Sequence, residues 1–470
     1  MQPDSAIALP PPRARRPRPP APIPRERPLG TLGFLAALRR NPLETWTREH
    51  FEEPIVVREA VIGRRAVVND PDAVRRILID NAANYRKDAL QRRLLAPGLG
   101  QGLLMAEGAA WRQQRRALAP LFTPKMVESF IPAMTEAAGR LVERWQRHRD
   151  GRVIEIGAEM RRVTLQVLER TIFSDGLERD PETFAHNVTR YFDTFGRIDP
   201  LDILGVPEWV PRLGRVRGRR PLRFFDEAVE AIIAARRRRL AGERASIPHD
   251  LLTLLMEATD PETGQGLSEA EIRTNIITFI GAGHETTANA LTWSLFLVAS
   301  DQEVRARLEA EADRELASGA PLGSIEELSA TRAVVEEAMR LYPPAPILTR
   351  EAIAADDLVG VRIRPGTMVV IAPWLLHRHR LLWTEPDLFA PWRFLPERRG
   401  EINRFAYLPF GAGPRVCIGA AFALQEAVIV LATILRAFRL DVVPGHRVVP
   451  VQRVTLRPQG GMPMSVQRRA

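Results

Sequence analysis

Cysteine is almost absent from the sequence, which holds one such residue, Cys417, among 470. A single cysteine excludes internal disulfide bonds, and it excludes zinc or iron–sulfur sites built from several thiolates. This cysteine content is typical of proteins that work in a reducing compartment, so we expect a cytoplasmic protein. Cys417 therefore either acts alone or has only a structural role, as a small buried apolar residue.

Long apolar segments are missing as well. Crossing a bilayer takes roughly 18 uncharged apolar residues, and the best candidates, 291–299 and 427–435, are far shorter. Residues 1–28 are rich in proline and arginine and lack the apolar core of a signal peptide. We expect residues 1–28 to form a disordered tail and residues 29–470 to form a single domain, without a transmembrane anchor and as a monomer.

Lysine is scarce too, because all basic residues except Lys87 and Lys125 are arginines. The net charge of +10 comes from basic residues spread over the whole chain. No stretch interleaves basic and aromatic residues in the manner of a nucleic-acid-binding surface. The excess charge therefore indicates a solvated basic surface, and nucleic acid is not an expected partner.

The residues that are present favour a large folded core, with 45% hydrophobic and 26% charged residues. Residues 54–80 predict two strands that turn at Gly63, followed by a helix capped by Asp70 with Pro71 at its first position. Residues 268–299 predict one long helix, opened by a capping box of Ser268 and Glu271. Most of the remaining chain has helical patterning, which predicts a mainly α fold with small β-sheets.

The middle of the long helix carries the sequence "GAGHETT", in which Gly281 and Gly283 each weaken the helix by about 1 kcal/mol relative to alanine. One interpretation is close packing against another element. The other is room for a ligand at the helix backbone, with Glu285 and Thr286 as protonic groups beside it. The Thr286 hydroxyl is also placed to donate to the carbonyl of Ala282, one turn earlier.

A second pattern, "EEAMRLYPPAP", places Glu337 and Arg340 three residues apart on one helical face, before Pro343 and Pro344 end the helix. Taken alone, this spacing describes an exposed ion pair worth about 0.3 to 0.5 kcal/mol. The pattern by itself does not decide a function.

The surroundings of the lone cysteine form the third pattern, "LPFGAGPRVCIGAAFALQE". A glycine-rich loop leads into a helix, and backbone amides at a helix start favour the thiolate form of a nearby sulfur. No histidine or asparagine lies where a cysteine protease would need it, and we interpret His377 and His379 as polar loop residues. A thiolate as the only protein ligand of an iron porphyrin remains, because the porphyrin supplies the four equatorial ligands.

These motifs resemble the cytochrome P450 superfamily. "FGAGPRVCIG" matches its heme-binding loop at every fixed position, and "GAGHETT", "EEAMR" and "PWRF" resemble its distal, Glu-x-x-Arg and Pro-x-Arg-Phe motifs in the family's order. "WRQQRRALAPLF" resembles its Trp-x-x-x-Arg helix, so the resemblance runs from about residue 30 to the end. In "PWRF" Trp392 stands where the family usually has an acidic residue.

The resemblance implies the cytochrome P450 fold, with a long central helix over a heme b held by the Cys417 thiolate. It implies that Glu285 and Thr286 relay protons to bound oxygen, which would lie at Ala282 and Gly283. It also implies a buried charge network and a set of heme-binding residues. The network comprises Glu337, Arg340 and Arg393; the heme-binding residues are Trp111, Arg115, Arg350, Phe410, Gly411, Arg415 and Gly419.

The function that the resemblance implies is insertion of one oxygen atom of O2 into a hydrophobic molecule such as a fatty acid, terpenoid, steroid or aromatic compound. Apolar pocket residues expected from family position are Phe279, Ile347, Leu348 and Met462. NAD(P)H-derived electrons would come from a ferredoxin or flavodoxin with its reductase, docking near Arg112 and Arg116. A peroxygenase, which would lack the acid–alcohol pair, and a non-catalytic heme-thiolate sensor are the alternatives.

Overall fold

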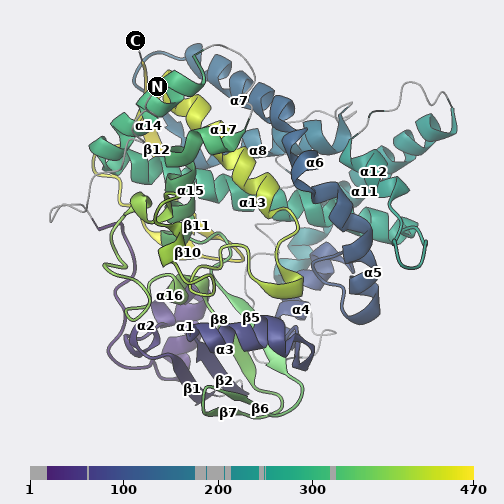
Figure 1. The fold of residues 1–470 in the computed structure, drawn as a ribbon, viewed down its shortest axis with the longest axis vertical. Coiled ribbons are helices and arrows are strands. Elements are labelled where there is room, and N and C mark those ends of the chain that lie inside the picture. The colour runs from purple at the N-terminus through teal and green to yellow at the C-terminus, as the bar shows by residue number, and fades with distance from the viewer. Residues whose placement is uncertain are drawn as a thin grey trace.

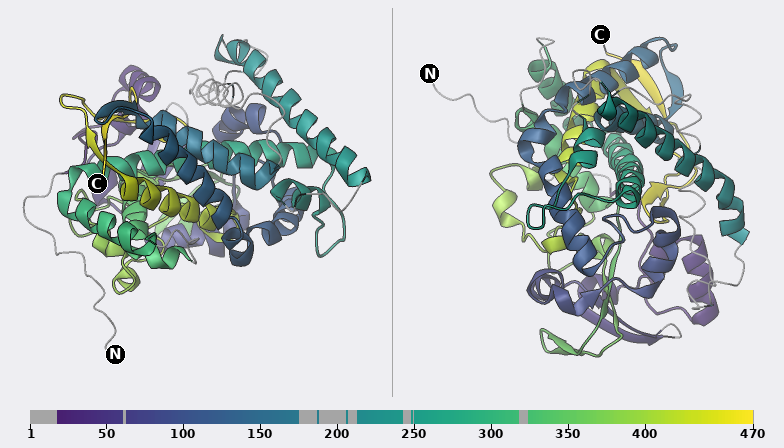
Figure 2. Two further views of the ribbon diagram at one scale, coloured as in Figure 1. Left: turned by 90° about the horizontal axis from the view of Figure 1, so that it is seen from above. Right: turned by 90° about the vertical axis from the view of Figure 1, so that its right-hand side faces the viewer.

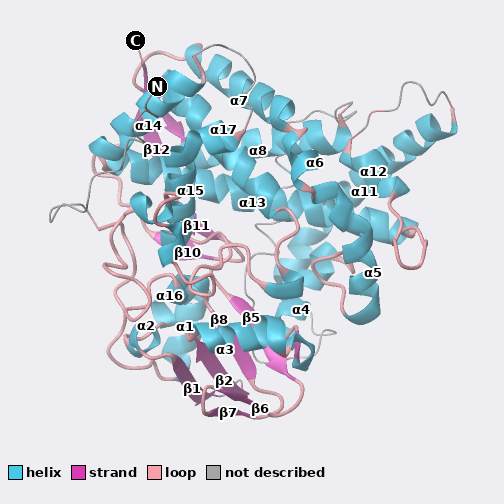
Figure 3. Ribbon diagram, in the orientation of Figure 1, coloured by secondary structure: helices cyan, strands magenta, loops and turns pink. Residues whose placement is uncertain are grey.

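The computed structural model describes residues 18–60, 63–174, 213–242, 250–317 and 324–469, together with Asn187, Val206 and Pro248. These residues form a helical body and, at one end of it, a region of strands (Figure 1). The side view in Figure 2 shows the same division, with the purple and green strands below the helices. Coloured by element type, the fold is mainly helical with small groups of strands (Figure 3), as the sequence predicts.

The helices of the described part have the following bounds: α1 Thr31–Arg40, α2 Glu49–Glu52, α3 Pro71–Arg75, α4 Ala89–Leu99, α5 Gly108–Leu118, α6 Pro124–Glu128, α7 Ile131–Gln146, α8 Ile156–Leu168, α11 Leu213–Ala241, α12 Leu251–Glu257, α13 Glu269–Ser300, α14 Gln302–Glu315, α15 Ser329–Leu341, α16 Pro373–Leu376 and α17 Ala420–Ala437. Three short helical turns matter below: η2 Arg76–Asp80, η8 Pro391–Phe394 and η10 Gly413–Arg415.

Helix α13 is the centre of the helical body and packs against α8, α15 and α17. Its 32 residues span about 48 Å at 1.5 Å per residue. The predicted capping box is present: the Ser268 hydroxyl accepts from the Glu271 N–H at 3.3 Å, and the Glu271 carboxylate accepts from the Ser268 N–H at 2.9 Å. From Ala288 to Val298 every residue is buried, so the C-terminal half of the helix forms the core while its middle faces a cavity.

The strand region is a five-stranded sheet in the order β1-β2-β8-β5-β3. Its strands are β1 Ile55–Ala60, β2 Gly63–Val68, β3 Tyr85–Arg86, β5 Leu348–Ala352 and β8 Met368–Ile371. Strands β1 and β2 pair antiparallel, as predicted, and Gly63 has a φ of 92° at their turn. The Asp70 side chain accepts from two backbone N–H groups at the start of α3, where Pro71 is the first residue, which confirms the predicted cap.

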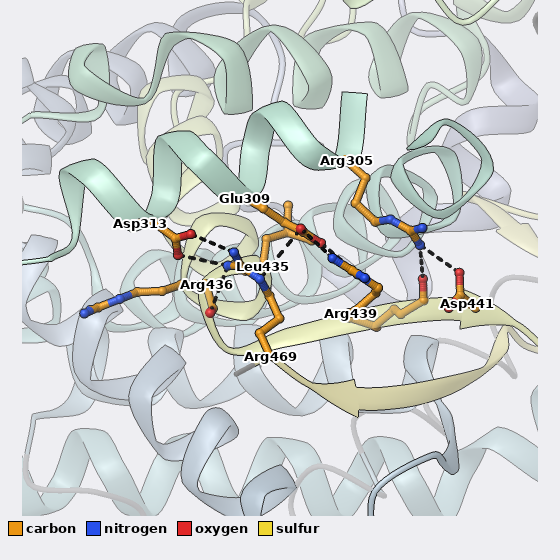
Figure 4. A network of polar contacts seen from close by, with 9 residues as sticks. Arg305, Glu309, Asp313, Leu435, Arg436, Arg439, Asp441 and Arg469 are labelled. Atoms are coloured by element: carbon orange, nitrogen blue, oxygen red, sulfur yellow. Dashed lines mark hydrogen bonds and ion pairs between the residues drawn. The ribbon is translucent and has the colours of Figure 1, made fainter. Parts of the chain in front are cut away.

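Three smaller sheets complete the fold, and one of them is tied to the helical body by charges. Their strands are β4 Arg152–Glu155, β6 Asp356–Leu358, β7 Val361–Ile363, β9 Phe438–Val442, β10 Pro450–Gln452, β11 Leu456–Pro458 and β12 Pro463–Arg468. Figure 4 shows how α14 holds the sheet β4-β12-β9: Glu309 pairs with Arg439 at 3.0 Å, and Asp313 pairs with Arg469 at 2.6 Å. This network fixes the end of the chain to the helices.

Residues 18–28, which the sequence places in the N-terminal tail, have a defined structure. Residues 18–28 lie against the folded body: the Tyr342 hydroxyl donates to the carbonyl of Pro20 at 2.8 Å, and the Arg25 guanidinium donates to the carbonyl of Glu44 at 2.7 Å. These contacts satisfy backbone carbonyls that a free tail would leave to water. Placing residues 18–28 in a disordered tail is therefore wrong, and residues 1–17 lie outside the described residues.

Helix α17 also corrects an expectation about apolar segments. Its 18 residues have a mean hydropathy of 1.7, and by length and composition this helix passes for a membrane span. Its place in the fold explains this apolar composition: α17 packs between α7, α13, α14 and α15, and 61% of the segment is buried. A core helix that is covered on several sides is apolar nearly all round.

Candidate active site

A cavity of about 1140 Å³ lies between α13, α5, the sheet and the loop that carries Cys417. Most of the site residues expected from the sequence line it, although they come from four separate segments of the chain. The lining includes Trp111, Arg115, Phe279, Ala282, Gly283, Glu285, Thr286, Ile347, Leu348, Arg350, Phe410, Gly411, Arg415, Cys417 and Gly419.

The loop before α17 presents the sulfur of Cys417 to this cavity. Cys417 is the one free thiol, and it is accessible from the cavity although it lies deep in the protein. Its backbone N–H donates to the carbonyl of Phe410 at 2.9 Å, which closes the loop around the side chain. Burial raises the pKa of the Cys417 thiol, whereas the Gly419 backbone N–H and the charge of Arg115 act in the opposite direction.

Two glycines allow the loop to take this shape. Gly411 and Gly413 have φ angles of 71° and 72°, a region that other residues rarely adopt. A Cβ on Gly413 would also lie 2.0 Å from the carbonyl oxygen of Leu78 in η2, so only glycine fits there. Gly413 is therefore required because the backbone of η2 leaves no room for a Cβ at this position.

The charge network of Glu337 and Arg340 is completely buried, with no exposed side-chain area on either residue. Arg340 donates to both Glu337 oxygens, at 2.6 and 2.8 Å, and to the carbonyls of His377, Pro386 and Leu388. The reading of this pair as an exposed surface pair is therefore wrong, and the buried network implied by the resemblance is present.

The third member of the network, Arg393 in η8, is more loosely connected. Its Nε lies 3.9 Å from Glu337 Oε1, and its Nη2 donates to the carbonyl of Glu385 at 3.0 Å. Glu337 Oε1 also accepts from the backbone N–H of Ala390 at 2.7 Å. The network thus holds together α15 and the segment around η8.

His377, interpreted from the sequence as a polar loop residue, belongs to the site. It is completely buried; its carbonyl accepts from Arg340, and its Nε2 accepts from the backbone N–H of Leu408 at 2.8 Å. Leu408 lies two residues before Phe410, so His377 connects the buried ion pair to the Cys417 loop. Burial and the charges of Arg340 and Arg378 lower the pKa of His377 to about 3, which keeps Nε2 free to accept.

Positive side chains gather at the end of the cavity near the Cys417 loop. The Arg415 guanidinium lies over the Trp111 ring, 4.1 Å from its centroid, and donates to the carbonyl of Ala106 at 2.7 Å. Burial lowers the pKa of Arg415 to about 10, with a further contribution from Arg350. Burial also lowers the pKa of Arg115 and that of Arg350.

Lys87 is a second residue that the sequence analysis missed. Its side chain is buried, it lines the same end of the cavity, and its ammonium group donates to the carbonyl of Leu104. Burial and the charges of Arg415 and Arg350 lower the pKa of Lys87 to about 7, against a weaker opposing effect of Glu107. One available signal was that Lys87 is one of only two lysines in a chain that otherwise uses arginine.

Helix α13 contributes the opposite wall. The Thr286 hydroxyl donates to the carbonyl of Ala282 at 2.5 Å, as predicted. A Cβ on Gly283 would approach the Leu168 side chain at 3.2 Å, so this glycine allows α8 to pack closely against α13. The Glu285 carboxylate is turned toward the β10–β11 turn, where it accepts from the Thr455 hydroxyl at 2.7 Å and lies 3.7 Å from Arg457.

The apolar part of the cavity includes three of the four predicted pocket residues. Phe279 packs edge to face on Phe122 with ring centroids 5.4 Å apart, and Ile347 and Leu348 also line the cavity. The placement of Met462 in the pocket is wrong: its side chain is fully buried in the hydrophobic core and does not line the cavity. Its N–H donates to Glu155 at 2.8 Å, which ties this segment to the sheet β4-β12-β9 instead.

The expected partner-docking arginines also differ from each other. Arg116 forms a two-bond ion pair with the fully buried Asp260, at 2.7 Å for each bond, and contacts Glu262 at 3.1 Å. Its charge is therefore used within the fold. Arg112 is exposed on the same helix.

The residues that are present fit a heme. One thiol opens into the cavity, and four cations, Lys87, Arg115, Arg350 and Arg415, lie at one end, where two propionate carboxylates would offset their repulsion. Within the described ranges, no cluster of three or more His, Cys, Asp or Glu side chains is arranged to hold a metal ion on its own. An iron that brings its own equatorial ligands needs only the thiolate.

The fold and the cavity place this chain in the class of heme-thiolate monooxygenases. The chain belongs to the cytochrome P450 family, whose sequence model matches residues 22–463. Two solved structures have the same fold over 96% of this chain at 27% identity: a cytochrome P450 (CYP102L1), with a TM-score of 0.80 and 100% of that chain covered, and the cytochrome P450DA heme domain, with a TM-score of 0.81 and 98% covered.

Curated relatives give the same class. Cyclooctat-9-en-7-ol 5-monooxygenase of Streptomyces melanosporofaciens is 32% identical over 418 residues, which are 88% of each chain. Pentalenene oxygenase of Streptomyces avermitilis is 34% identical over 360 residues, 76% of this chain and 78% of the relative. The protein is therefore a monooxygenase of the cytochrome P450 family.

Proposed function

We propose that the enzyme hydroxylates or epoxidises a hydrophobic small molecule, such as a fatty acid, terpenoid, steroid or aromatic compound, in the cytoplasm. The observation that carries this proposal is that a single cavity joins the Cys417 sulfur, the Thr286 hydroxyl and an apolar chamber. Two relatives are named for the oxygenation of cyclooctat-9-en-7-ol and pentalenene, which supports an apolar substrate.

Heme b would be held by groups that surround one end of the cavity. Cys417 would ligate the iron, Trp111, Arg115, Arg350 and Arg415 would bind the propionates together with Lys87, and Phe410 would shield the sulfur from water. When bound, the heme supplies the binding and reductive cleavage of O2, which the thiolate favours by donating electron density. The buried network of Glu337, Arg340 and His377 keeps the Cys417 loop in place for that role.

Protons would reach the cavity through α13. Because the Thr286 hydroxyl donates its proton to the carbonyl of Ala282, its oxygen is left as an acceptor facing the cavity. Glu285 connects the cavity lining with Thr455 in the β10–β11 turn. In this proposal Glu285 takes up protons from the side of that turn, and Thr286 positions them as part of a general-acid relay.

Electrons would come from NAD(P)H through a separate ferredoxin or flavodoxin and its reductase. Both Gly-Ala-Gly segments of the chain have other uses, since Gly281 and Gly283 lie inside α13 and Gly411 and Gly413 shape the Cys417 loop. Neither lies at a strand-to-helix turn that would bind a dinucleotide. The exposed Arg112 is available to attract an acidic partner.

The test is the carbon monoxide spectrum of the reduced protein, followed by turnover with surrogate partners. We expect a strongly red-shifted Soret band that is lost in Cys417→Ser, because a hydroxyl does not replace the thiolate. We also expect NADH consumption with a surrogate ferredoxin to rise when an apolar substrate is added. A normal Soret position would refute thiolate ligation, and product formation from hydrogen peroxide alone, with none from NADH, would instead support the peroxygenase.

A further inference from the structure

A stripe of three side chains on α13 bonds to residues 455–456, where the β10–β11 turn leads into β11 (Figure 1). Glu285, Asn289 and Trp293 are spaced four residues apart, which places them on one face of the helix. Trp293 Nε1 donates to the carbonyl of Leu456 at 3.2 Å. Asn289 Nδ2 donates to the Thr455 hydroxyl at 3.2 Å, and that hydroxyl donates to Glu285 Oε1 at 2.7 Å.

The segment that carries Thr455 is held from two sides. The Leu456 N–H donates to the carbonyl of Pro344, just beyond the end of α15, at 3.0 Å, while the Leu456 carbonyl accepts from Trp293. The Trp293 ring is fully buried and stacks on Tyr342 with ring centroids 3.9 Å apart. Thr455 itself is 6% exposed and lines the cavity. The Thr455 hydroxyl therefore has a fixed place relative to α13.

The chemistry of Asn289 determines which way the Thr455 hydroxyl points. Asn289 Nδ2 can only donate, so the Thr455 oxygen accepts from it and the single hydroxyl proton is directed to Glu285 Oε1. Asn289 is buried, and burying a polar group is costly unless it is hydrogen-bonded. The two polar side chains thus form a chain of hydrogen bonds that ends at the Glu285 carboxylate.

Glu285 contacts the turn through one carboxylate oxygen. Its bond with Thr455 and its 3.7 Å approach to Arg457 both use Oε1, and the approach to Arg457 is too long for a hydrogen bond. The side chain keeps 14% of its area exposed, and Glu285 lines the cavity. The Thr455 hydroxyl is therefore the closest restraint on a carboxylate that the cavity can reach.

A fixed carboxylate matters for moving a proton. A free glutamate side chain samples several rotamers, whereas proton transfer needs donor and acceptor within hydrogen-bond reach. The neighbouring Thr286 is already fixed, because its hydroxyl donates to the carbonyl of Ala282 at 2.5 Å. Misplacing a group by about 1 Å in such a site can cost roughly 100-fold in rate.

We propose that Thr455 is a positioning residue of the proton relay: its hydroxyl, oriented by Asn289, holds Glu285 Oε1 on the β10–β11 turn and leaves Oε2 to exchange protons on the cavity side. This inference rests on the proposed function, since it takes Glu285 as a member of the relay. It goes further by making proton supply depend on a segment 170 residues away in the chain.

The experiment compares Thr455→Val, which keeps the shape of the side chain without the hydroxyl, with Thr455→Ser, which keeps the hydroxyl. Thr278→Val is the matched control, because Thr278 is also buried at the cavity but its hydroxyl donates to the carbonyl of Thr274 within α13, at 2.7 Å. The probe is whichever of limonene, testosterone, naphthalene and dodecanoate gives the largest spin-state change of the heme.

We expect Thr455→Val to lower product formed per NADH about 10-fold, with the remaining electrons of NADH reducing O2 to hydrogen peroxide. Its dissociation constant for the probe, from the spin-state change, should differ little from that of wild type. The ratio of product rates in H2O and D2O should rise, because a misplaced carboxylate slows proton transfer. Thr455→Ser and Thr278→Val should both keep most of the wild-type product per NADH.

Two double-variant measurements separate positioning from a merely structural role. If Thr455 acts through Glu285, adding Thr455→Val to Glu285→Ala should lower product per NADH no further. The second measurement needs no turnover. In urea unfolding, the two substitutions together should shift the midpoint by less than the sum of their single shifts, because both remove the same hydrogen bond.

Four results would overturn the inference: unchanged product per NADH in Thr455→Val, an equal loss in Thr278→Val, a further loss on the Glu285→Ala background, or additive midpoint shifts. Wild type separates this inference from the proposed function. If wild type forms product from NADH and Thr455→Val does so equally well, only the role of Thr455 fails. If wild type forms no product from NADH with any probe, the proposed function fails, and the midpoint shifts still decide whether Thr455 holds Glu285.

Discussion

The connection between His377 and the Cys417 loop allows a quantitative test in which two variants differ in one hydrogen bond. In His377→Phe, the backbone N–H of Leu408 loses its acceptor inside the protein. In His377→Gln, the amide oxygen takes the place of Nε2 and preserves an acceptor. At about pH 7 we expect His377→Phe to lower the free energy of unfolding by about 1 to 3 kcal/mol more than His377→Gln does, the cost of an unsatisfied buried donor.

The pH dependence supplies the second part of the test. The pKa of His377 is lowered to about 3 in the folded protein, mainly by burial, whereas the unfolded chain has the ordinary value of 6.5. The unfolded state therefore binds a proton as the pH falls below about 6.5, and the folded state does so only near pH 3. The stability that comes from the neutral ring is complete above about pH 6.5 and is lost progressively between that pH and about pH 3.

Between about pH 7 and pH 5 this loss amounts to about 2 kcal/mol for one histidine. Neither variant has the titrating ring, so the stability difference between wild type and His377→Phe should shrink by about that amount over the same interval. His284, which is also buried with its pKa lowered to about 3, is present in all three proteins and cancels in the comparison.

The assay is urea-induced unfolding followed by far-ultraviolet circular dichroism at several pH values, with the Soret band recorded in parallel. A stability difference that stays constant from about pH 7 to pH 5 would refute the reasoning on His377 titration. Equal destabilisation by Phe and Gln at neutral pH would show that the bond to Leu408 does not hold the loop.

Three further predictions concern the loop, the proton relay and the partner surface. Gly413→Ala should fold with much less bound heme than Gly411→Ala, measured by Soret absorbance per protein, because only the former places its Cβ 2.0 Å from a backbone carbonyl oxygen. Thr286→Ala should lower product formed per NADH roughly 10-fold or more, with the missing product appearing as hydrogen peroxide while substrate binding is retained; unchanged coupling would remove Thr286 from the relay. Arg112→Glu should slow reduction by the partner without loss of stability, whereas Arg116→Glu should lower the free energy of unfolding, because it removes the cationic partner of the buried Asp260 carboxylate; equal stability of the two variants would contradict this division.

The features that sequence reasoning predicted correctly depend on neighbouring residues in the chain. The cap of α13 needs only Ser268 and Glu271, three residues apart, and the start of α3 needs only Asp70 and Pro71. The Cys417 loop was likewise recognised from a continuous motif. Such signals are local, so they can be read without knowledge of the tertiary contacts.

The features that sequence reasoning missed depend on contacts between distant segments. His377 gains its role from Arg340 on one side and Leu408 on the other, and Lys87 gains its role from the arginines that converge on it. The exclusion of Met462 from the cavity follows from how the last strands pack, and the strict need for Gly413 follows from a carbonyl in η2. No local pattern distinguishes these residues before the chain is folded.

The scarcity of lysine gives the cavity a built-in chemical reporter. The arginine side chains of this protein do not react with acylating reagents, which leaves two amines on its side chains, Lys87 inside the cavity and Lys125 on the surface. With a pKa of about 7, Lys87 is in large part an uncharged nucleophile at neutral pH, so a small reagent that enters the cavity will label it. The ratio of label on Lys87 to label on Lys125 in a peptide mass map therefore measures how much of a preparation has its cavity filled.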